Sequence, residues 1–163
     1  MKETVNIEVI EDSCYVCEDY SKLNSTNPPK IAIISCEGAC ARGEVSRLAA
    51  NLIAHKLSPE NTVRICLGAA FTKNAGQRDL VRNAKKVIVI EGCFIHCASR
   101  MMQGVIEDLN PIVIDADDIY GVNTPFGINE VPDSQLKEYS EIVAEKIVKE
   151  FIDSDGSESA DNS

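Results

Sequence analysis

Four short runs of aliphatic residues, separated by stretches with helical periodicity, are the feature that most constrains how this chain can fold. The runs lie at residues 31–35, 63–67, 87–90 and 112–114. Each run is continuous rather than alternating, which is typical of strands that are buried on both faces of a parallel sheet. We therefore expect the four runs to form one sheet with helices on both faces.

Apolar residues recur at three- and four-residue spacing between these runs and after the last one. They predict helices over residues 45–57, 80–84 and 101–109, and a last helix that is capped by Asp133 or Ser134 and carries apolar residues as far as Phe151. The order of elements indicates an α/β fold, an open parallel sheet of about four strands with right-handed crossovers. Its strand order is expected to be flavodoxin-like or Rossmann-like.

The two ends of the chain differ in composition from its middle. Residues 1–29 are interpreted as an N-terminal appendage, in which Val5, Ile7 and Val9 alternate with polar residues and predict a short edge strand. A polar linker ending in two prolines precedes the α/β domain, which is assigned to residues 30–152. Residues 153–163 are acidic and small, and are predicted to be a disordered tail.

The charge balance excludes several classes of function. The 163 residues include 16 Lys and Arg against 26 Asp and Glu, a formal net charge of −10. Such a surface repels phosphates, so neither a nucleic acid nor an anionic membrane is expected as a partner. No apolar run reaches the roughly 20 residues that cross a bilayer, and the acidic, alternating N-terminus is unlike a secretory signal. We expect a soluble, cytoplasmic protein.

Seven cysteines, all before residue 100, are the unusual part of the composition; they are Cys14, Cys17, Cys36, Cys40, Cys66, Cys93 and Cys97. An odd number without a signal peptide argues against a secreted disulfide framework, and clustered thiols in a reducing compartment more often bind metal or do thiol chemistry. The last five follow or end three of the predicted strands. Because the carboxyl ends of parallel strands share one edge of the sheet, where ligands bind, these five are expected to converge there.

A metal ion bound by four thiolates is the first hypothesis for this edge. The predicted ligands are Cys36, Cys66, Cys93 and Cys97, and Zn²⁺ is the expected ion, because a tetrahedral metal neutralises four thiolates. An iron–sulfur cluster at the same cysteines is an alternative that residue types cannot separate from zinc. Cys40, Cys14 and Cys17 are additional ligand candidates or resolving thiols. The role would be metal or sulfur handling or redox sensing, and whether the protein is an enzyme stays open.

Three segments in this region resemble the DGC-domain family, whose members are regarded as zinc-binding proteins. They are Cys36-Glu-Gly38 after a strand, Cys66-Leu-Gly68, and an apolar strand that runs into Glu91-Gly-Cys93 with a second cysteine at Cys97. The similarity covers about residues 30–122, with Glu91 in place of the Asp of the family motif. The resemblance implies four chelating cysteines at Cys36, Cys66, Cys93 and Cys97, and supplies no known activity.

The first loop also permits a different chemistry. Cys36 and Arg42 form a Cys-x5-Arg pattern between a strand and a helix, which resembles the loop of low-molecular-weight tyrosine phosphatases and arsenate reductases. That mechanism needs a low-pKa Cys36 nucleophile, backbone N–H groups around an oxyanion and a clamp by Arg42. The Asp-Pro general acid of those enzymes is absent, and Asp115, Asp117 and Asp118 are the nearby substitutes.

Other polar residues flank the proposed site. His96 lies between Cys93 and Cys97 and is a candidate ligand or proton donor. Glu37 and Glu91 are candidates for binding the metal, for supporting its ligands, or for the more common task of capping a helix.

Overall fold

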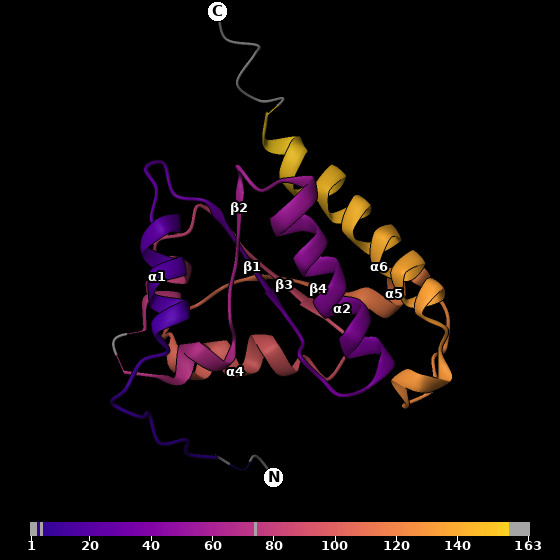
Figure 1. The fold of residues 1–163 in the computed structure, drawn as a ribbon, viewed down its shortest axis with the longest axis horizontal. Coiled ribbons are helices and arrows are strands. Elements are labelled where there is room, and N and C mark those ends of the chain that lie inside the picture. Colours follow the sequence, from indigo (N-terminus) through magenta and orange to yellow (C-terminus); the bar gives the residue numbers. More distant parts are fainter. Residues whose placement is uncertain (1–2, 4, 74, 157–163) are drawn as a thin grey trace, which may run out of the picture.

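A parallel sheet of four strands lies at the centre of the computed structural model, which describes residues 3, 5–73 and 75–156 (Figure 1). The strands are β1 (Ile31–Ser35), β2 (Thr62–Arg64), β3 (Val87–Glu91) and β4 (Ile112–Asp115). All three strand pairings are parallel, which confirms the predicted α/β class. The strands begin within a residue of the predicted runs, but β2 ends three residues earlier than its run.

The strand order is β2-β1-β3-β4. It matches the first four strands of the flavodoxin-like order and differs from the Rossmann order, in which the first strand lies next to the fourth. The order reverses between β1 and β3, which pair in the register Ile33↔Ile88. In open α/β sheets the crevice beyond the carboxyl ends of two such strands is the usual ligand site.

Helices cover both faces of the sheet (Figure 1). The bounds of the helices are α1 (Tyr15–Asn24), α2 (Ala41–Leu52), α3 (Gly76–Arg82), α4 (Cys97–Val105), α5 (Ala116–Tyr120) and α6 (Asp133–Ile147). Helices α2, α5 and α6 pack on one face, and α1, α3 and α4 lie on the other. Both α2 and α6 continue as a single π-helical turn, at Ile53–Leu57 and Val148–Ile152, so they end close to where periodicity predicted.

The continuous aliphatic runs follow from this three-layer arrangement. Successive side chains of a strand point to opposite faces, so Ile31 and Ile33 pack against α2 and α6, while Ala32 and Ile34 pack against α3 and α4. Neither face is open to water, and every residue of β1 is buried. A polar residue at either kind of position would lose its hydration.

The N-terminal segment differs from the prediction. Val5, Ile7 and Val9 are exposed and form no strand, and an isolated bridge from Ile10 to Thr72 is the sheet-like contact of this segment. The alternation of apolar and polar residues did not predict this segment correctly, because a strand also needs a neighbouring strand with which to pair. Residues 5–9 pair with no strand of the described sheet. Helix α1 covers only the first four residues of the predicted polar linker, and its Tyr20 packs against the core beneath α3 and α4.

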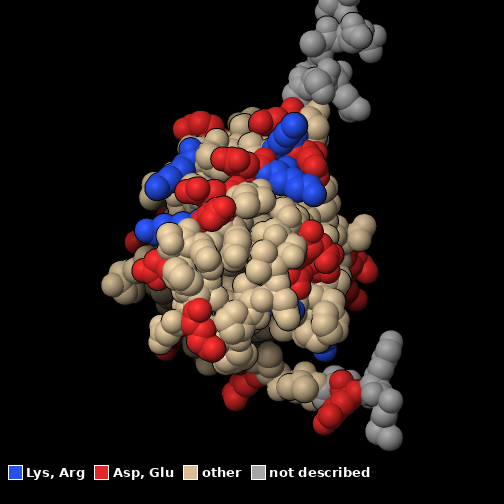
Figure 2. Space-filling view, turned by 90° about the vertical axis from the view of Figure 1, so that its right-hand side faces the viewer, with Lys and Arg blue, Asp and Glu red and all other residues tan. Residues whose placement is uncertain are grey.

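At the other end, Asp153–Gly156 form a 3-10 turn, and the rest of the acidic stretch lies outside the described residues. Among the helices that the structure describes, none combines the length and apolar character needed to cross a bilayer. On the face drawn in Figure 2, acidic side chains are spread widely, whereas most Lys and Arg side chains gather towards the C-terminal end. The net negative charge is thus visible as a scattered acidic surface.

Two adjacent methionines test the packing of α4. Met102 is fully buried against the sheet, whereas Met101 is 40% exposed. We expect Met102→Ala to lower the free energy of unfolding by about 2–5 kcal/mol, because it leaves a cavity in the core. Urea denaturation measures this loss. Met101→Ala is the matched control and should change it far less; equal losses would contradict the observed orientation of α4.

Candidate functional site

The loops that follow the strands place the predicted ligands along the carboxyl edge of the sheet. Cys36 directly follows β1 and is buried; Cys66 lies two residues beyond β2 and is exposed. Cys93 is in the turn after β3 and is half-buried, and Cys97 is the first residue of α4 and is exposed. All seven cysteines are in the described part of the chain, and all are free.

The loops after β1 and β3 are in close contact. The N–H of Cys36 donates to the carbonyl of Ile90 at 2.9 Å. A Cβ at Gly92 would lie 3.0 Å from the backbone of Arg42, and within the loop after β1 a Cβ at Gly43 would collide with the carbonyl oxygen of Gly38. Glycine is needed at both positions because two backbones approach each other there. The switch point of the sheet therefore holds Cys36 against the segment that carries Cys93 and Cys97.

The surroundings of the Cys36 thiol favour its protonated form. Burial raises the pKa of Cys36, and the negative potentials of Glu91 and Cys97 raise it further. Hydrogen bonds from the N–H groups of Gly38, at 3.4 Å, and Gly92 oppose this shift without cancelling it. The direction is the reverse of what a phosphatase nucleophile needs, because such a thiol must be ionised near neutral pH.

Arg42 is also engaged elsewhere. Its guanidinium donates to Oδ1 of Asn123 at 2.8 Å and lies 3.3 Å from Oδ2 of Asp117. Two nitrogens are thus paired with the segment that follows β4. The double clamp on an oxyanion that the Cys-x5-Arg interpretation requires receives no support from this arrangement.

Glu91, at the end of β3, is completely buried and caps α4. Its carboxylate accepts hydrogen bonds from the N–H groups of Ser99 at 2.7 Å and Ala98 at 3.2 Å. The positive end of the helix dipole and two donors compensate the buried charge. Glu91 therefore fixes the start of α4, and with it the backbone of Cys97, as the capping interpretation predicted.

His96 precedes α4 in the left-handed backbone region, with φ of 55°. Its Nε2 lies 2.8 Å from Oδ1 of Asp115, which ends β4. This contact ties the turn after β3 to the neighbouring strand. Two edge carboxylates, Glu91 and Asp115, thus fix the C-terminal end of the Cys93–Cys97 segment.

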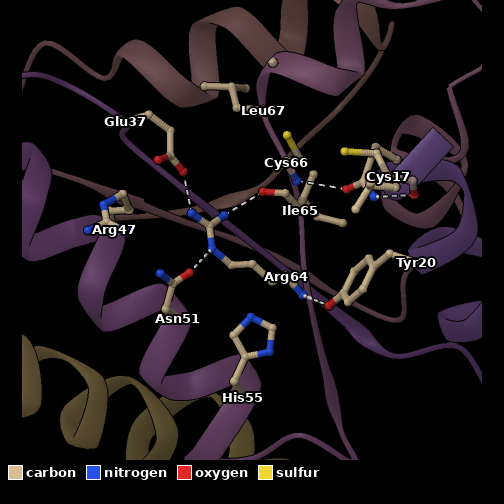
Figure 3. Close-up of a pocket in the computed structure, with 13 residues that line it drawn as sticks. Cys17, Tyr20, Glu37, Arg47, Asn51, His55, Arg64, Ile65, Cys66 and Leu67 are labelled. Carbon is tan, nitrogen blue, oxygen red and sulfur yellow. Dashed lines mark hydrogen bonds and ion pairs between the residues drawn. The ribbon is translucent and has the colours of Figure 1, made fainter. Parts of the chain in front are cut away.

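On the other side of β1, a cleft of about 480 Å³ opens between α1, α2 and the end of β2 (Figure 3). Arg64 forms much of its floor. The Arg64 side chain donates to Asn51 at 2.9 Å and Ser35 at 2.6 Å, and pairs with the carboxylate of Glu37. Because its charge is already compensated, Arg64 is not free to attract an anion.

Cys17 and Cys66 lie at the rim of this cleft, and sequence reasoning did not predict that they meet (Figure 3). Burial raises the pKa of the Cys17 thiol to about 12, and the neighbouring side chains of Cys14 and Cys66 add to this increase. Hydrogen bonds from the backbone N–H and the side chain of Cys17 lower the pKa of Cys14. The spacing Cys-x2-Cys was a signal, but nothing in the sequence joined it to Cys66.

The described residues contain no group of three or more His, Cys, Asp or Glu side chains arranged around a common point for a metal ion. Four thiols on three loops of one edge nevertheless have the chemistry that soft metal ions select. To bind one ion together, the three loops that carry these thiols would have to close around it. Each of these loops also contains a glycine, at Gly38, Gly68 or Gly92. That Cys36, Cys66, Cys93 and Cys97 bind one ion together stays a prediction.

The fold and site define a class: an α/β protein with flavodoxin-like strand order and free thiols at the switch point of its sheet. Comparison with family descriptions identifies it further, since the DGC domain matches residues 32–146. This match spans well over half of the chain, and the protein belongs to the DGC-domain family. No curated protein and no solved structure matches the chain significantly.

The raised pKa of Cys36 has a consequence for stability. Native Cys36 holds its proton to higher pH than the unfolded thiol, whose ordinary pKa is 9.0. This contribution to stability is present below that value and is lost as pH rises through the native pKa. We expect the free energy of unfolding of the metal-free protein to fall above pH 9.0, and Cys36→Ser to reduce the slope.

Urea denaturation over a pH series measures both slopes. Cys40→Ser is the matched control for the loss of a thiol from the same loop, and the slope of Cys36→Ser is compared with its slope. An unchanged slope in Cys36→Ser would show that Cys36 does not titrate as described.

The cap on α4 can be tested with an isosteric change. Glu91→Gln removes the charge and places an amide N–H₂ opposite one of the two backbone donors, so we expect it to lower the free energy of unfolding by about 1–3 kcal/mol. Glu107→Gln, at an exposed position beyond α4, should change it by less than about 0.5 kcal/mol. Chemical denaturation of both variants measures the two changes in the free energy of unfolding. Similar losses in Glu91→Gln and Glu107→Gln would refute the capping role.

Proposed function

We propose that this DGC-domain protein binds one zinc ion through Cys36, Cys66, Cys93 and Cys97, and that it serves in metal or sulfur handling or in redox sensing. The proposal rests most on one observation. Cys36 lies buried at the switch point of the sheet beside Glu91 and Cys97, both of which oppose its ionisation. Several thiolates can coexist at such a place only when a cation compensates them.

Glu91 is not needed as a ligand of that cation, because its carboxylate already accepts hydrogen bonds from the N–H groups of Ala98 and Ser99. The loop after β3 offers the thiols of Cys93 and Cys97 instead. Sulfur donors favour zinc, copper(I) and iron–sulfur clusters over magnesium or calcium. Zn²⁺ suits a set of four thiolates because it takes four tetrahedral ligands without redox chemistry.

The exposure of two ligands supports a role in handling the metal. Cys66 and Cys97 are exposed, whereas Cys36 is buried. An ion held by one buried and two exposed thiolates would stay within reach of solvent and of competing thiols, unlike the enclosed ion of a structural zinc site. A place where thiols must remain reduced also favours the cytoplasm.

Metal content of protein purified without oxygen tests the proposal directly. We expect one colourless zinc ion per chain by elemental analysis. A brown protein with visible absorbance would replace zinc by an iron–sulfur cluster at this edge, and a chain that stays metal-free with added Zn²⁺ would overturn metal binding.

Substitution of single cysteines tests the ligand set. Serine at Cys36, Cys66, Cys93 or Cys97 removes a bond to the metal, so we expect each variant to lose more zinc affinity than the about 10–100-fold typical of outer-shell changes. Competition with a chromophoric chelator measures the affinity. Cys40→Ser is the matched control and should retain wild-type affinity, because the proposed set excludes Cys40. Equal affinities in all five variants would contradict this ligand set.

A further inference from the structure

A second group of thiols lies on the other side of β1 from Cys36. The side chain of Cys17 lies beside those of Cys14 and Cys66, both of which raise its pKa, although Cys66 is far away along the sequence. Figure 3 shows the Cys17 and Cys66 side chains as neighbours at the rim of the cleft. Cys14 and Cys17 lie outside the segment that matches the DGC domain.

Gln77, at the start of α3, holds this arrangement together. It is buried, and its side-chain oxygen accepts the N–H of Cys66 at 2.8 Å. Its amide nitrogen donates to the carbonyl of Cys17 at 3.2 Å and to the hydroxyl of Ser21 at 2.8 Å. One side chain therefore satisfies the backbones of both cysteines and fixes α1 against the loop after β2.

A further contact places the first turn of α1. The carboxylate of Glu18 accepts the N–H of Gly76 at 2.9 Å, and a Cβ at Gly76 would lie 2.7 Å from Cβ of Ser21. The close approach of α1 and α3 keeps Cys17 beside the loop after β2. The packing of α1 and α3 therefore determines where these thiols lie.

We propose that Cys14, Cys17 and Cys66 form a thiol–disulfide exchange centre that accepts the disulfides of small thiols. Cys14 and Cys66 are exposed and Cys17 lies between them, half-buried. Cys14 occupies the N-cap position of the ten-residue helix α1, where the helix dipole favours a thiolate. These positions make Cys14 the attacking thiol and Cys17 the resolving thiol.

The exchange balances without any other reactant. The Cys14 thiolate attacks one sulfur of the disulfide RSSR, forms a mixed disulfide and releases one thiolate RS⁻. Cys17 then attacks Sγ of Cys14, its proton passes to solvent, and a second RS⁻ leaves as the Cys14–Cys17 disulfide forms. Attack by Cys66 on Sγ of Cys17 moves the disulfide to Cys17–Cys66 and restores Cys14. Two protein thiols are oxidised, and one RSSR is reduced to two RSH.

One consequence rests on the proposed function. Because Cys66 is also one of the four proposed zinc ligands, a disulfide from Cys17 to Cys66 would remove it from the ligand set. Oxidation at the cleft would then weaken zinc binding at the switch point.

Tryptic mapping can follow the exchange because each group of cysteines falls on its own peptide. Cys14 and Cys17 lie on residues 3–22, and Cys66 lies alone on residues 65–73. Residues 31–42 carry Cys36 and Cys40, and residues 87–100 carry Cys93 and Cys97. The probe is bis(2-hydroxyethyl) disulfide, which is neutral and is not repelled by the acidic surface.

Reduced, metal-free, full-length protein is treated with one equivalent of this probe. We expect peptide 3–22 to lose two hydrogens or to become linked to peptide 65–73. Linkage between peptides 31–42 and 87–100 as the main product, or the absence of any disulfide that involves peptide 3–22, would overturn the proposal.

Single substitutions separate the roles. We expect Cys14→Ser to slow reduction of the probe at least about tenfold, since the attacking thiol is lost. Serine remains a good helix cap, and circular dichroism checks that the variant is folded. Cys17→Ser should trap the mixed disulfide on Cys14. Cys40→Ser is the matched control with wild-type rate and products. A Cys14→Ser variant that reduces the probe at the wild-type rate would refute the centre.

The same mapping with zinc added keeps the two proposals distinguishable. If Cys66 binds zinc, the ion should suppress the link between peptides 3–22 and 65–73 and leave the Cys14–Cys17 disulfide. Exchange that persists with no effect of zinc would support the centre and count against Cys66 as a ligand. Zinc binding without exchange would refute the centre and leave the proposed function intact.

Discussion

The parallel pairing of β1 with β3 is the interaction on which the rest of the structure depends. It aligns the ends of the two strands, so that Cys36 and the segment from Glu91 to Cys97 lie side by side. Glu91, at the end of β3, then fixes the start of α4, because its buried carboxylate caps that helix. A buried carboxylate that accepts two helix donors serves the fold and also sets the negative potential at Cys36.

That negative potential links the fold to the proposed chemistry. A thiol that is buried beside a carboxylate and another thiol keeps its proton until a cation arrives. Metal binding at such a place would release protons, so its strength should depend on pH as well as on the number of ligands. The nearby guanidinium of Arg42 does not supply the missing charge, since it pairs with Asp117 and Asn123.

The cysteines fall into two groups that meet at one residue. One group surrounds the switch point, and the other joins α1 to the loop after β2 through Gln77. Cys66 belongs to the edge of the sheet by its place after β2 and to the second group by its contact with Cys17. This shared position would allow the thiol state of the N-terminal helix to influence a metal site in the DGC domain.

Local patterns in the sequence determined the strands, most helices and the edge at which five cysteines lie, because burial on both faces leaves an unmistakable aliphatic run and parallel strands must end together. Capping was one of three roles that the sequence left open for Glu91, and the hydrogen bonds from Ala98 and Ser99 selected it. Patterns could not distinguish flavodoxin-like from Rossmann-like order, nor exclude a strand at Val5–Val9, because strand neighbours are chosen by long-range packing. Only the tertiary structure placed Cys17 beside Cys66 and Arg42 beside Asp117. Contacts between such distant segments depend on how the helices pack on the sheet, and local periodicity does not encode this packing.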